Sequence, residues 1–322
     1  YPSPLENNFK PERDDVFVEL AGSFLKSQAR QSKATSILEV ACFDGYALYQ
    51  FKKMGYQVCG VDPSDGALIG RKHGLNIHKA FYDPRMFLNR NETFDVVISR
   101  HFLEHVVEPS EYIEKFKQVL RPNGTLVIEV PNAAYYLSRG LMEVFSPQHI
   151  QGFTKHSLSK VLNDAGLSVL ELIESKNNLI AFSSVSPKAV VTPLANYTAY
   201  MNQYVDLIAK NKATIKETVQ HYLDSNKTIA LWGAGGFAVA AIKLYGIAPK
   251  NISFIIDSDP KKCGLSFIGM TPEIINVDKL QCQKVDLIII ASMYSDSIVK
   301  QIENLDSEAD ILMLYPTVKV LE

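Results

Sequence analysis

Carboxylates follow the first two apolar runs of this chain at the spacing of a nucleotide-binding turn. The run at 36–40 contains Glu39 and leads within a few residues to Gly45. The next run, 57–61, is followed by Asp62, 17 residues after Gly45. An acidic residue at the end of the second strand of a strand–helix–strand unit accepts hydrogen bonds from both hydroxyls of a ribose. The pattern therefore predicts a nucleoside site with Asp62 on the ribose.

The turn between these runs is acidic and poor in glycine. Ala41 and Phe43 stand where a pyrophosphate cradle needs glycine. Asp44 lies beside the expected helix start, where its charge repels phosphate. The turn thus favours a cofactor that carries positive charge and no phosphate, as S-adenosylmethionine does with its sulfonium and ammonium groups.

A second glycine turn lies in the C-terminal part of the chain. Gly233, Gly235 and Ala238 fit G-x-G-x-x-G/A directly after the apolar run 228–232, and Asp257 ends the next run. In this context the motif is typical of nucleotide or dinucleotide binding. A turn that serves only helix–strand packing is the alternative.

The two turns organise two similar halves of the chain. Each half begins with a strand, a turn and a helix and continues with strands that alternate with helices, which predicts parallel sheets covered on both faces. Between the halves, apolar residues of 195–226 recur at steps of three, four and seven, which indicates one long amphipathic helix. The fold class is therefore α/β, with two Rossmann-like doubly wound domains in tandem joined by a long helix. Further strands are expected at 57–61, 94–99, 125–130, 168–174, 178–185, 253–257, 287–291 and 311–315.

Three motifs of the first half resemble those of class I S-adenosylmethionine-dependent methyltransferases. They are the turn Glu39–Gly45 with Gly60–Ser64, the run Ser99–Pro109, and the run Leu120–Pro131. The resemblance implies S-adenosylmethionine as cofactor. It also implies cofactor contacts for Glu39, Ala41, Phe43, Asp44 and Gly45 around the methionine end, Asp62 at the ribose, Asp83 near the adenine, and Arg100 and His101 beside the methionine portion.

The segment after the fifth expected strand resembles the sugar C-methyltransferase family, which methylates nucleotide-linked keto sugars. The resemblance covers nearly the whole chain, and the family's usual N-terminal zinc-binding domain is not expected within these residues. It implies that His149, in the insert 132–151, removes a proton next to a ketone. Gln148 replaces the glutamate that precedes this histidine in the family and is expected to hydrogen-bond the acceptor. O- or N-methylation of a related acceptor needs only one base and stays open, as does a purely structural histidine.

Further acceptor contacts are expected from both halves. His105 lies one helical turn beyond His101, and an orienting role is favoured over catalysis. No third ligand is spaced to join this pair, so no metal site is expected. The remaining expected contacts to a nucleotide-sugar are Tyr1, Asn132, Gly233, Gly235, Gly236 and Asp257.

Composition limits the alternatives. The chain has 322 residues, which suits two domains at roughly 150 residues each. The expected division is a methyltransferase domain at 1–190, a helical linker at 191–226 and a nucleotide-sugar-holding domain at 227–322. A net charge of −2 does not indicate the excess of basic residues that binding to nucleic acid or an anionic membrane requires. No apolar run reaches spanning length, and isolated cysteines fit the cytoplasm.

Two other classes of protein remain open at this point. One is a non-catalytic nucleotide-sugar-binding protein, suggested by Ala41 and Phe43 at glycine positions. The other is an NAD-dependent sugar oxidoreductase that uses the second glycine turn. Binding of S-adenosylmethionine, of NAD or of neither separates the three classes. Oligomers are compatible with all of them.

Overall fold

The structure is a computed structural model, and it divides the chain into two compact units. It describes the residues 15–28, 35–141, 145, 148–175, 177–185, 197–267, 272–305 and 307–321. The first unit comprises 1–134 and 146–195, and the second comprises 135–145 and 196–322. Tyr1, an expected acceptor contact, lies outside the described residues.

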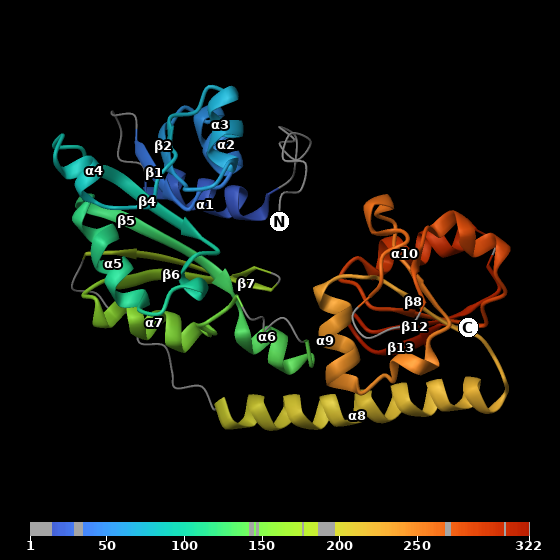
Figure 1. Cartoon of the computed structure of the whole chain (residues 1–322). Helices are drawn as coiled ribbons and strands as arrows, with labels where there is room; N and C mark the ends of the chain where they lie inside the picture. The colour runs from blue at the N-terminus through green and yellow to red at the C-terminus, as the bar shows by residue number, and fades with distance from the viewer. Residues whose placement is uncertain are drawn as a thin grey trace. The chain divides into compact units, whose positions relative to one another are not determined.

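The first unit is built on a seven-stranded sheet (Figure 1). The strand order is β3-β2-β1-β4-β5-β7-β6, in which the first five strands are parallel and β7 is antiparallel to both of its neighbours. The carboxyl ends of β1 and β4 therefore meet at the point where the strand order reverses, which is where open α/β sheets bind ligands. The strands are β1 Ser36–Val40, β2 Gln57–Val61, β3 Ile77–His78, β4 Phe94–Arg100, β5 Leu120–Pro131, β6 Ser168–Ser175 and β7 Asn178–Ser184.

Helices cover both faces of this sheet. Phe17 of α1 and Phe51 of α2 belong to one apolar cluster, whereas Phe116 of α5 and Leu158 of α7 belong to another. All four side chains are buried, so the strands between them are apolar on both faces. The helices of this region are α1 Val16–Gln28, α2 Tyr46–Lys53, α3 Gly66–Lys72, α4 Arg85–Leu88, α5 Pro109–Gln118, α6 Ala133–Ser138 and α7 Lys155–Asp164.

The second unit contains a six-stranded sheet of the same kind. Its order is β10-β9-β8-β11-β12-β13, and only β13 is antiparallel to its neighbour. In both sheets, the strand that comes first in the sequence lies at the point where the strand order reverses, as the α/β prediction requires. The strands are β8 Ile229–Trp232, β9 Phe254–Ile256, β10 Ile274–Ile275, β11 Leu287–Ile290, β12 Asp310–Met313 and β13 Lys319–Leu321.

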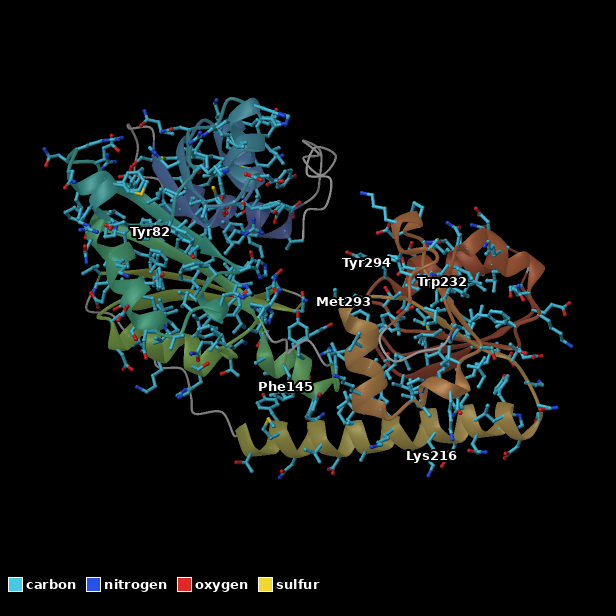
Figure 2. The ribbon with its side chains drawn as sticks, viewed as in Figure 1. Tyr82, Phe145, Lys216, Trp232, Met293 and Tyr294 are labelled. Carbon is cyan, nitrogen blue, oxygen red and sulfur yellow. The ribbon has the colours of Figure 1, made fainter. Side chains whose placement is uncertain are left out.

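The long helix α8, Tyr197–Asp224, is part of the second unit rather than a separate linker. Its Ile215 and Val219 are buried in one cluster with α9, Gly236–Tyr245, whereas α10, Ser295–Glu303, packs on the other face of the sheet. The segment 135–145, which the sequence placed in the first domain, also groups here. The reason is visible at Phe145, whose ring lies 5.3 Å from that of Tyr204 of α8 (Figure 2).

The backbone conformation of the turn after β1 explains why glycine suits several of its positions. Ala41, Phe43 and Gly45 all have positive φ, at 60°, 50° and 72°. A residue with a Cβ pays about 1–2 kcal/mol in this left-handed region. A Cβ on Gly45 would also lie 2.7 Å from the side chains of Leu75 and Ile77. Gly45 is therefore required by packing, whereas Ala41 and Phe43 hold the turn at some cost in stability.

None of the helices in the described part of the chain is both long and apolar enough to cross a bilayer.

Candidate active site

Asp62 joins the end of β2 to the turn after β1. Its Oδ2 accepts a hydrogen bond from the backbone N–H of Phe43 at 2.8 Å, and its Oδ1 accepts from the N–H of Ser64 at 2.8 Å. The hydroxyl of Ser64 donates to the same Oδ1. Three donors thus hold the carboxylate at the carboxyl end of the sheet, in the position predicted for the ribose contact.

Asp257 repeats this arrangement in the second unit. Its Oδ2 accepts from the N–H of Ala234 in the glycine turn, and its Oδ1 accepts from the N–H of Asp259, both at 2.9 Å. The difference is Lys262, whose Nζ lies 2.8 Å from Oδ2. Hydrogen bonds from Lys262 and from the two backbone N–H groups hold the pKa of Asp257 below its ordinary value, against the effect of burial. Asp257 therefore carries a neutralising cation that Asp62 lacks in the contacts described above.

Asp62→Asn is expected to weaken binding of S-adenosylhomocysteine by about tenfold or more. Hydrogen bonds to a charged acceptor are worth about 1.5–3 kcal/mol, and 1.4 kcal/mol is a factor of ten. Ser64→Ala is the matched control, because it removes one internal hydrogen bond and keeps the carboxylate. Calorimetric titration gives both affinities, and thermal unfolding shows whether the turn is intact. Equal affinities for folded Asp62→Asn and the wild type would contradict the ribose assignment.

Glu39 is the most strongly perturbed acid of the first unit. Its side chain is buried at the end of β1, and its Oε2 has no hydrogen-bond partner in the described part of the chain. Burial raises its pKa to about 8, although the nearby Arg100 works against that rise. A buried, unpaired carboxylate oxygen fits the ammonium group of S-adenosylmethionine, so the residues present suit this cofactor.

Arg100 does not face the site as a free cation. Its guanidinium bonds Glu129 at 2.6 Å and Asp15 at 3.2 Å, and it lies 4.1 Å from the ring centre of Phe17. Arg100 and Glu129 are register partners on β4 and β5. Asp15 and Glu129 were not predicted from the sequence as neighbours of Arg100. The signal for Glu129 was that β4 and β5 end side by side. The network places Arg100 as the positive neighbour of Glu39.

The other expected cofactor contacts fall into two groups. Asp44 accepts from the N–H of Tyr46 at 3.0 Å and so begins α2. The ring of Phe43 lies against Gly66, where a Cβ would come within 2.7 Å of it. Asp83 is instead paired with Arg85 near the surface, and these hydrogen bonds lower its pKa to about 2. Asp83 is therefore already engaged by Arg85 within the chain.

The insert after β5 docks on the segment that follows β4. The backbone oxygen of Glu104 accepts hydrogen bonds from the N–H groups of Ile150 at 2.7 Å and Gln151 at 3.0 Å. Nδ1 of His105 lies 2.7 Å from the backbone oxygen of Gln148. These contacts bring the ring of His149 to 5.0 Å from that of His105. Two stretches more than 40 residues apart therefore share one surface.

His101 and His149 both lie near a buried acid, Glu104. Nδ1 of His101 is 3.5 Å from Oε1 of Glu104, and its Nε2 is 3.7 Å from Glu129. His101 itself has a positive φ of 48°, which turns its side chain out of the strand direction. Burial lowers the pKa of His149, with Glu104 acting in the opposite sense. The sequence analysis overlooked Glu104, although it lies three residues after His101.

Donor atoms of Glu104, His105 and His149 lie within 4.8 Å of one another. This group does not contain the pair His101 and His105 for which the sequence showed no third ligand, and spacing along one segment cannot show a neighbour that the insert supplies. Asn132 differs in another way: it is buried, and its Oδ1 accepts from the N–H of Ala134 at the start of α6. Its side-chain oxygen is engaged in a local turn.

The second glycine turn borders a hollow of about 510 Å³. A Cβ on Gly235 or Gly236 would meet nothing within 4 Å, so the backbone faces open space there. Gly233 differs, since its φ is 115° and a Cβ would lie 2.6 Å from the backbone oxygen of Ala291. Tyr294 also lines the hollow and is 73% exposed (Figure 2). Gly233 thus serves packing, and the other two glycines leave room for a ligand.

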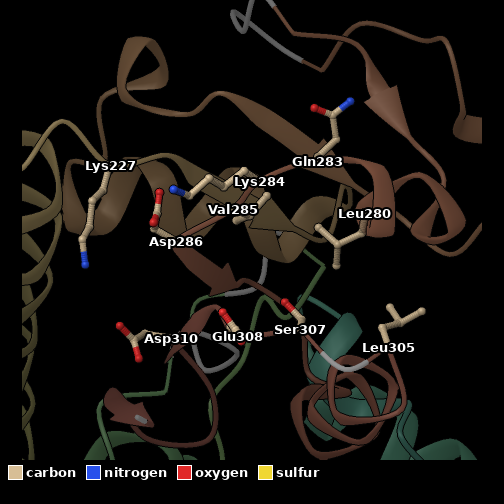
Figure 3. A pocket seen from close by; sticks show the side chains of 10 residues that line it. All are labelled: Lys227, Leu280, Gln283, Lys284, Val285, Asp286, Leu305, Ser307, Glu308 and Asp310. Carbon is tan, nitrogen blue, oxygen red and sulfur yellow. The ribbon is translucent and has the colours of Figure 1, made fainter.

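A second hollow of similar size lies in the same unit (Figure 3). Lys227, Asp286 and Asp310 line it, and each lies at or just before the start of a strand. Ligands of open α/β sheets bind at the carboxyl ends of the strands, which are the opposite ends. The hollow at the glycine turn is therefore the better nucleotide candidate.

Comparison with known families agrees with this geometry. A family described as "Methyltransferase domain" matches residues 13–172, and one described as "C-methyltransferase C-terminal domain" matches residues 189–315. The chain is thus similar to S-adenosylmethionine-dependent methyltransferases over its first half and to C-methyltransferases over its C-terminal part.

Curated relatives divide between two kinds of methyltransferase. The chain is 32% identical over 125 residues to the ubiquinone biosynthesis O-methyltransferase of Pasteurella multocida, covering 34% of this chain and 52% of that one. It is 22% identical over 249 residues to the C-methyltransferase NovU of Streptomyces niveus, covering 71% and 59%. The chain thus spans about half the length of the curated relatives it matches.

Solved structures of methyltransferases match part of this chain. A SAM-dependent methyltransferase from Archaeoglobus fulgidus has a TM-score of 0.39 at 18% identity and covers 52% of this chain and 93% of its own. Magnesium protoporphyrin IX methyltransferase from Synechocystis, solved with SAH, has a TM-score of 0.41 at 15% identity and covers 52% and 80%.

Proposed function

We propose that this enzyme methylates a nucleotide-linked sugar, and that C-methylation of a keto sugar is the reaction its architecture favours. The observation that carries the proposal is the second nucleotide-type turn, in a unit that matches a C-methyltransferase C-terminal domain. A methyl acceptor of ordinary size needs no second Rossmann-like unit. An acceptor that carries a nucleotide does, since its anionic part requires a site of its own.

The second turn suits an anionic nucleotide better than an uncharged group. Gly235 and Gly236 leave their backbone open at the start of α9, where N–H groups and the helix dipole favour negative charge. Lys262 adds a cation beside Asp257. Exposed Tyr294 on the rim offers an aromatic face to a base. We propose that this hollow holds the nucleotide and performs no redox step.

In the first unit, His149 is proposed as the proton acceptor. Glu39 and Asp62 would hold S-adenosylmethionine, which would supply an electrophilic methyl group when bound. The half-buried His149 removes a proton from the acceptor, and the exposed Gln148 next to it hydrogen-bonds the acceptor oxygen. His101 and His105 orient the acceptor from the segment after β4. A hydroxyl acceptor would use the same base, and similarity to the ubiquinone O-methyltransferases keeps O-methylation as the second candidate.

The reaction is tested by incubating the full chain with S-adenosylmethionine and a panel of nucleotide-linked keto and hydroxy sugars. Mass spectrometry shows which acceptor gains a methyl group, and nuclear magnetic resonance shows whether the new bond is to carbon or oxygen. Turnover of free phenols and of no sugar would overturn the sugar proposal. We place this chemistry in the cytoplasm, where nucleotide-sugars are made, and an oligomer is compatible with it.

Gly235→Val is expected to weaken acceptor binding by about tenfold or more and to leave binding of S-adenosylhomocysteine unchanged. The valine fills open space, so the free protein folds normally, but the ligand can no longer approach the backbone. Gly235→Ala is the graded control and should have a smaller effect. Calorimetric titrations measure the affinities for the nucleotide-sugar, for S-adenosylhomocysteine and for NAD. Tight NAD binding by the wild type would favour the oxidoreductase instead.

A further inference from the structure

Glu104 is a buried acid whose charge no hydrogen bond satisfies. It lies in the 3₁₀ turn η2, Leu103–His105, and is 1% exposed. Neither of its carboxylate oxygens has a hydrogen-bond partner in the described part of the chain. Leaving a buried charged group without partners costs several kcal/mol unless a cation or a donor compensates it. The arrangement indicates that something outside this chain completes the site.

The groups that face this carboxylate are imidazoles. Oε1 of Glu104 is 3.8 Å from Nε2 of His105 and 3.5 Å from Nδ1 of His101. His149 approaches from the insert, and its donor atom lies within 4.8 Å of those of Glu104 and His105. The other carboxylate nearby, Glu129, contacts the far side of His101 at 3.7 Å. Three histidines therefore lie near Glu104, and the donor atoms of two of them, His105 and His149, lie within 4.8 Å of each other and of its carboxylate.

The tautomer of His105 is fixed in the form that binds metals. Its Nδ1 lies 2.7 Å from the backbone oxygen of Gln148, and a carbonyl oxygen only accepts hydrogen bonds. Nδ1 must therefore carry the proton, and in the neutral ring the lone pair is on Nε2, the atom nearer to Glu104. A histidine that ligates a metal through one nitrogen commonly donates from the other to a carbonyl group. Here that partner is present.

The ligands are also held in place before any ion arrives. Two backbone hydrogen bonds from Ile150 and Gln151 to the oxygen of Glu104 fix the insert beside the turn. The 3.8 Å between Oε1 of Glu104 and Nε2 of His105 is close to the separation of about 3.4 Å that two ligands of a tetrahedral zinc ion have. Small movements of His149 complete the set.

We propose that Glu104, His105 and His149 bind one divalent transition-metal ion, for which Zn²⁺ is the representative. Two imidazoles and one carboxylate form an open three-ligand set and leave a fourth position for water or an acceptor oxygen. The ion neutralises the charge of Glu104 and replaces the hydrogen bonds that its oxygens lack.

The ion also controls the reaction, and this part rests on the proposed function. Nε2 or Nδ1 of His149 has one lone pair, which either takes the proton of the acceptor or binds the metal. Occupation of the site therefore inhibits methyl transfer, and removal of the ion restores it. The chain thus contains a metal-dependent off switch at the surface shared by η2 and the insert.

The site is tested on the full chain after treatment with EDTA and removal of the chelator. Titration with Co²⁺ is followed by its visible absorption, and titration with Zn²⁺ by calorimetry; both should show one ion per chain. Glu104→Gln should weaken the Zn²⁺ affinity on the order of 100-fold, because the loss of a ligand costs at least as much as the loss of an outer-shell partner. Glu108→Gln is the matched control, since this exposed acid lies in the same segment. It should bind the ions as the wild type does.

Other outcomes separate the two proposals. Absence of binding to the wild type, or equal Zn²⁺ affinity of Glu104→Gln and Glu108→Gln, overturns the metal site. One bound ion without inhibition of methyl transfer overturns the switch. If no sugar is methylated under any condition, the proposed function fails, while the two titrations still decide whether the metal site exists.

Discussion

His149→Ala lowers kcat for methyl transfer by about 10²–10⁴-fold, the usual contribution of a positioned general base. The half-buried ring of His149 lies 5.0 Å from that of His105, on the segment that follows the strand carrying Arg100. Affinity for S-adenosylhomocysteine should change little, because Glu39 and Asp62 belong to other elements. Steady-state kinetics with the acceptor found in the panel, measured with EDTA present, give the change in kcat.

Two further variants make this result specific. His73→Ala removes an exposed histidine at the end of α3 and should leave kcat unchanged. Gln148→Glu introduces the carboxylate that precedes the base in sugar C-methyltransferases, so it should raise the rate for a keto sugar and not for a hydroxyl acceptor. Full activity of His149→Ala would remove the base assignment and leave proximity of the two substrates as the source of catalysis.

The affinity for S-adenosylhomocysteine should rise with pH between 6 and 8. Burial raises the pKa of Glu39 to about 8 in the free protein, so below that pH the group is mostly protonated. The ammonium group of the ligand favours the ionised carboxylate, so binding lowers this pKa and releases a proton. The affinity therefore increases by up to about tenfold per pH unit and becomes constant above pH 8. Calorimetry in buffers of different ionisation enthalpy measures both the affinity and the released proton.

Glu39→Gln should bind the ligand weakly and without this pH dependence, whereas the exposed Glu19→Gln in α1 should retain it. The pH dependence of stability tests the direction of the Glu39 pKa shift independently. The folded protein holds the proton of Glu39 more tightly than the unfolded chain does, so the free energy of unfolding of the ligand-free enzyme falls between about pH 4.5 and pH 8. A proton release that is the same in the wild type and in Glu39→Gln would show that another group titrates.

Local features of the sequence were sufficient for the fold class and the nucleotide turns. Apolar runs followed by turns identified the strands, because strand, turn and helix signals are local. The positions of Asp62 and Asp257 after their strands followed from the same spacing, and each was found bonded to its own turn. The local sequence did not show that Ala41 and Phe43 adopt positive φ. Of the three residues of this turn that do so, only Gly45 is of a type that favours positive φ.

Only the tertiary structure decided which distant side chains meet. Arg100 was expected beside the cofactor, and the register of β4 and β5 also gives it Glu129 as a partner, to which α1 adds Asp15. Charged side chains bond the nearest opposite charge that packing offers, and sequence spacing does not give that neighbour.

The cluster of Glu104, His105 and His149 also shows what the sequence determines and what only the tertiary structure decides. The sequence determined that His101, Glu104 and His105 follow the fourth strand, and that His149 lies in an insert. Which of them share a point in space depended on two backbone hydrogen bonds from the insert to Glu104. Because the turn η2 and an insert more than 40 residues away are joined only through packing, the cluster of Glu104, His105 and His149 exists in the folded chain alone.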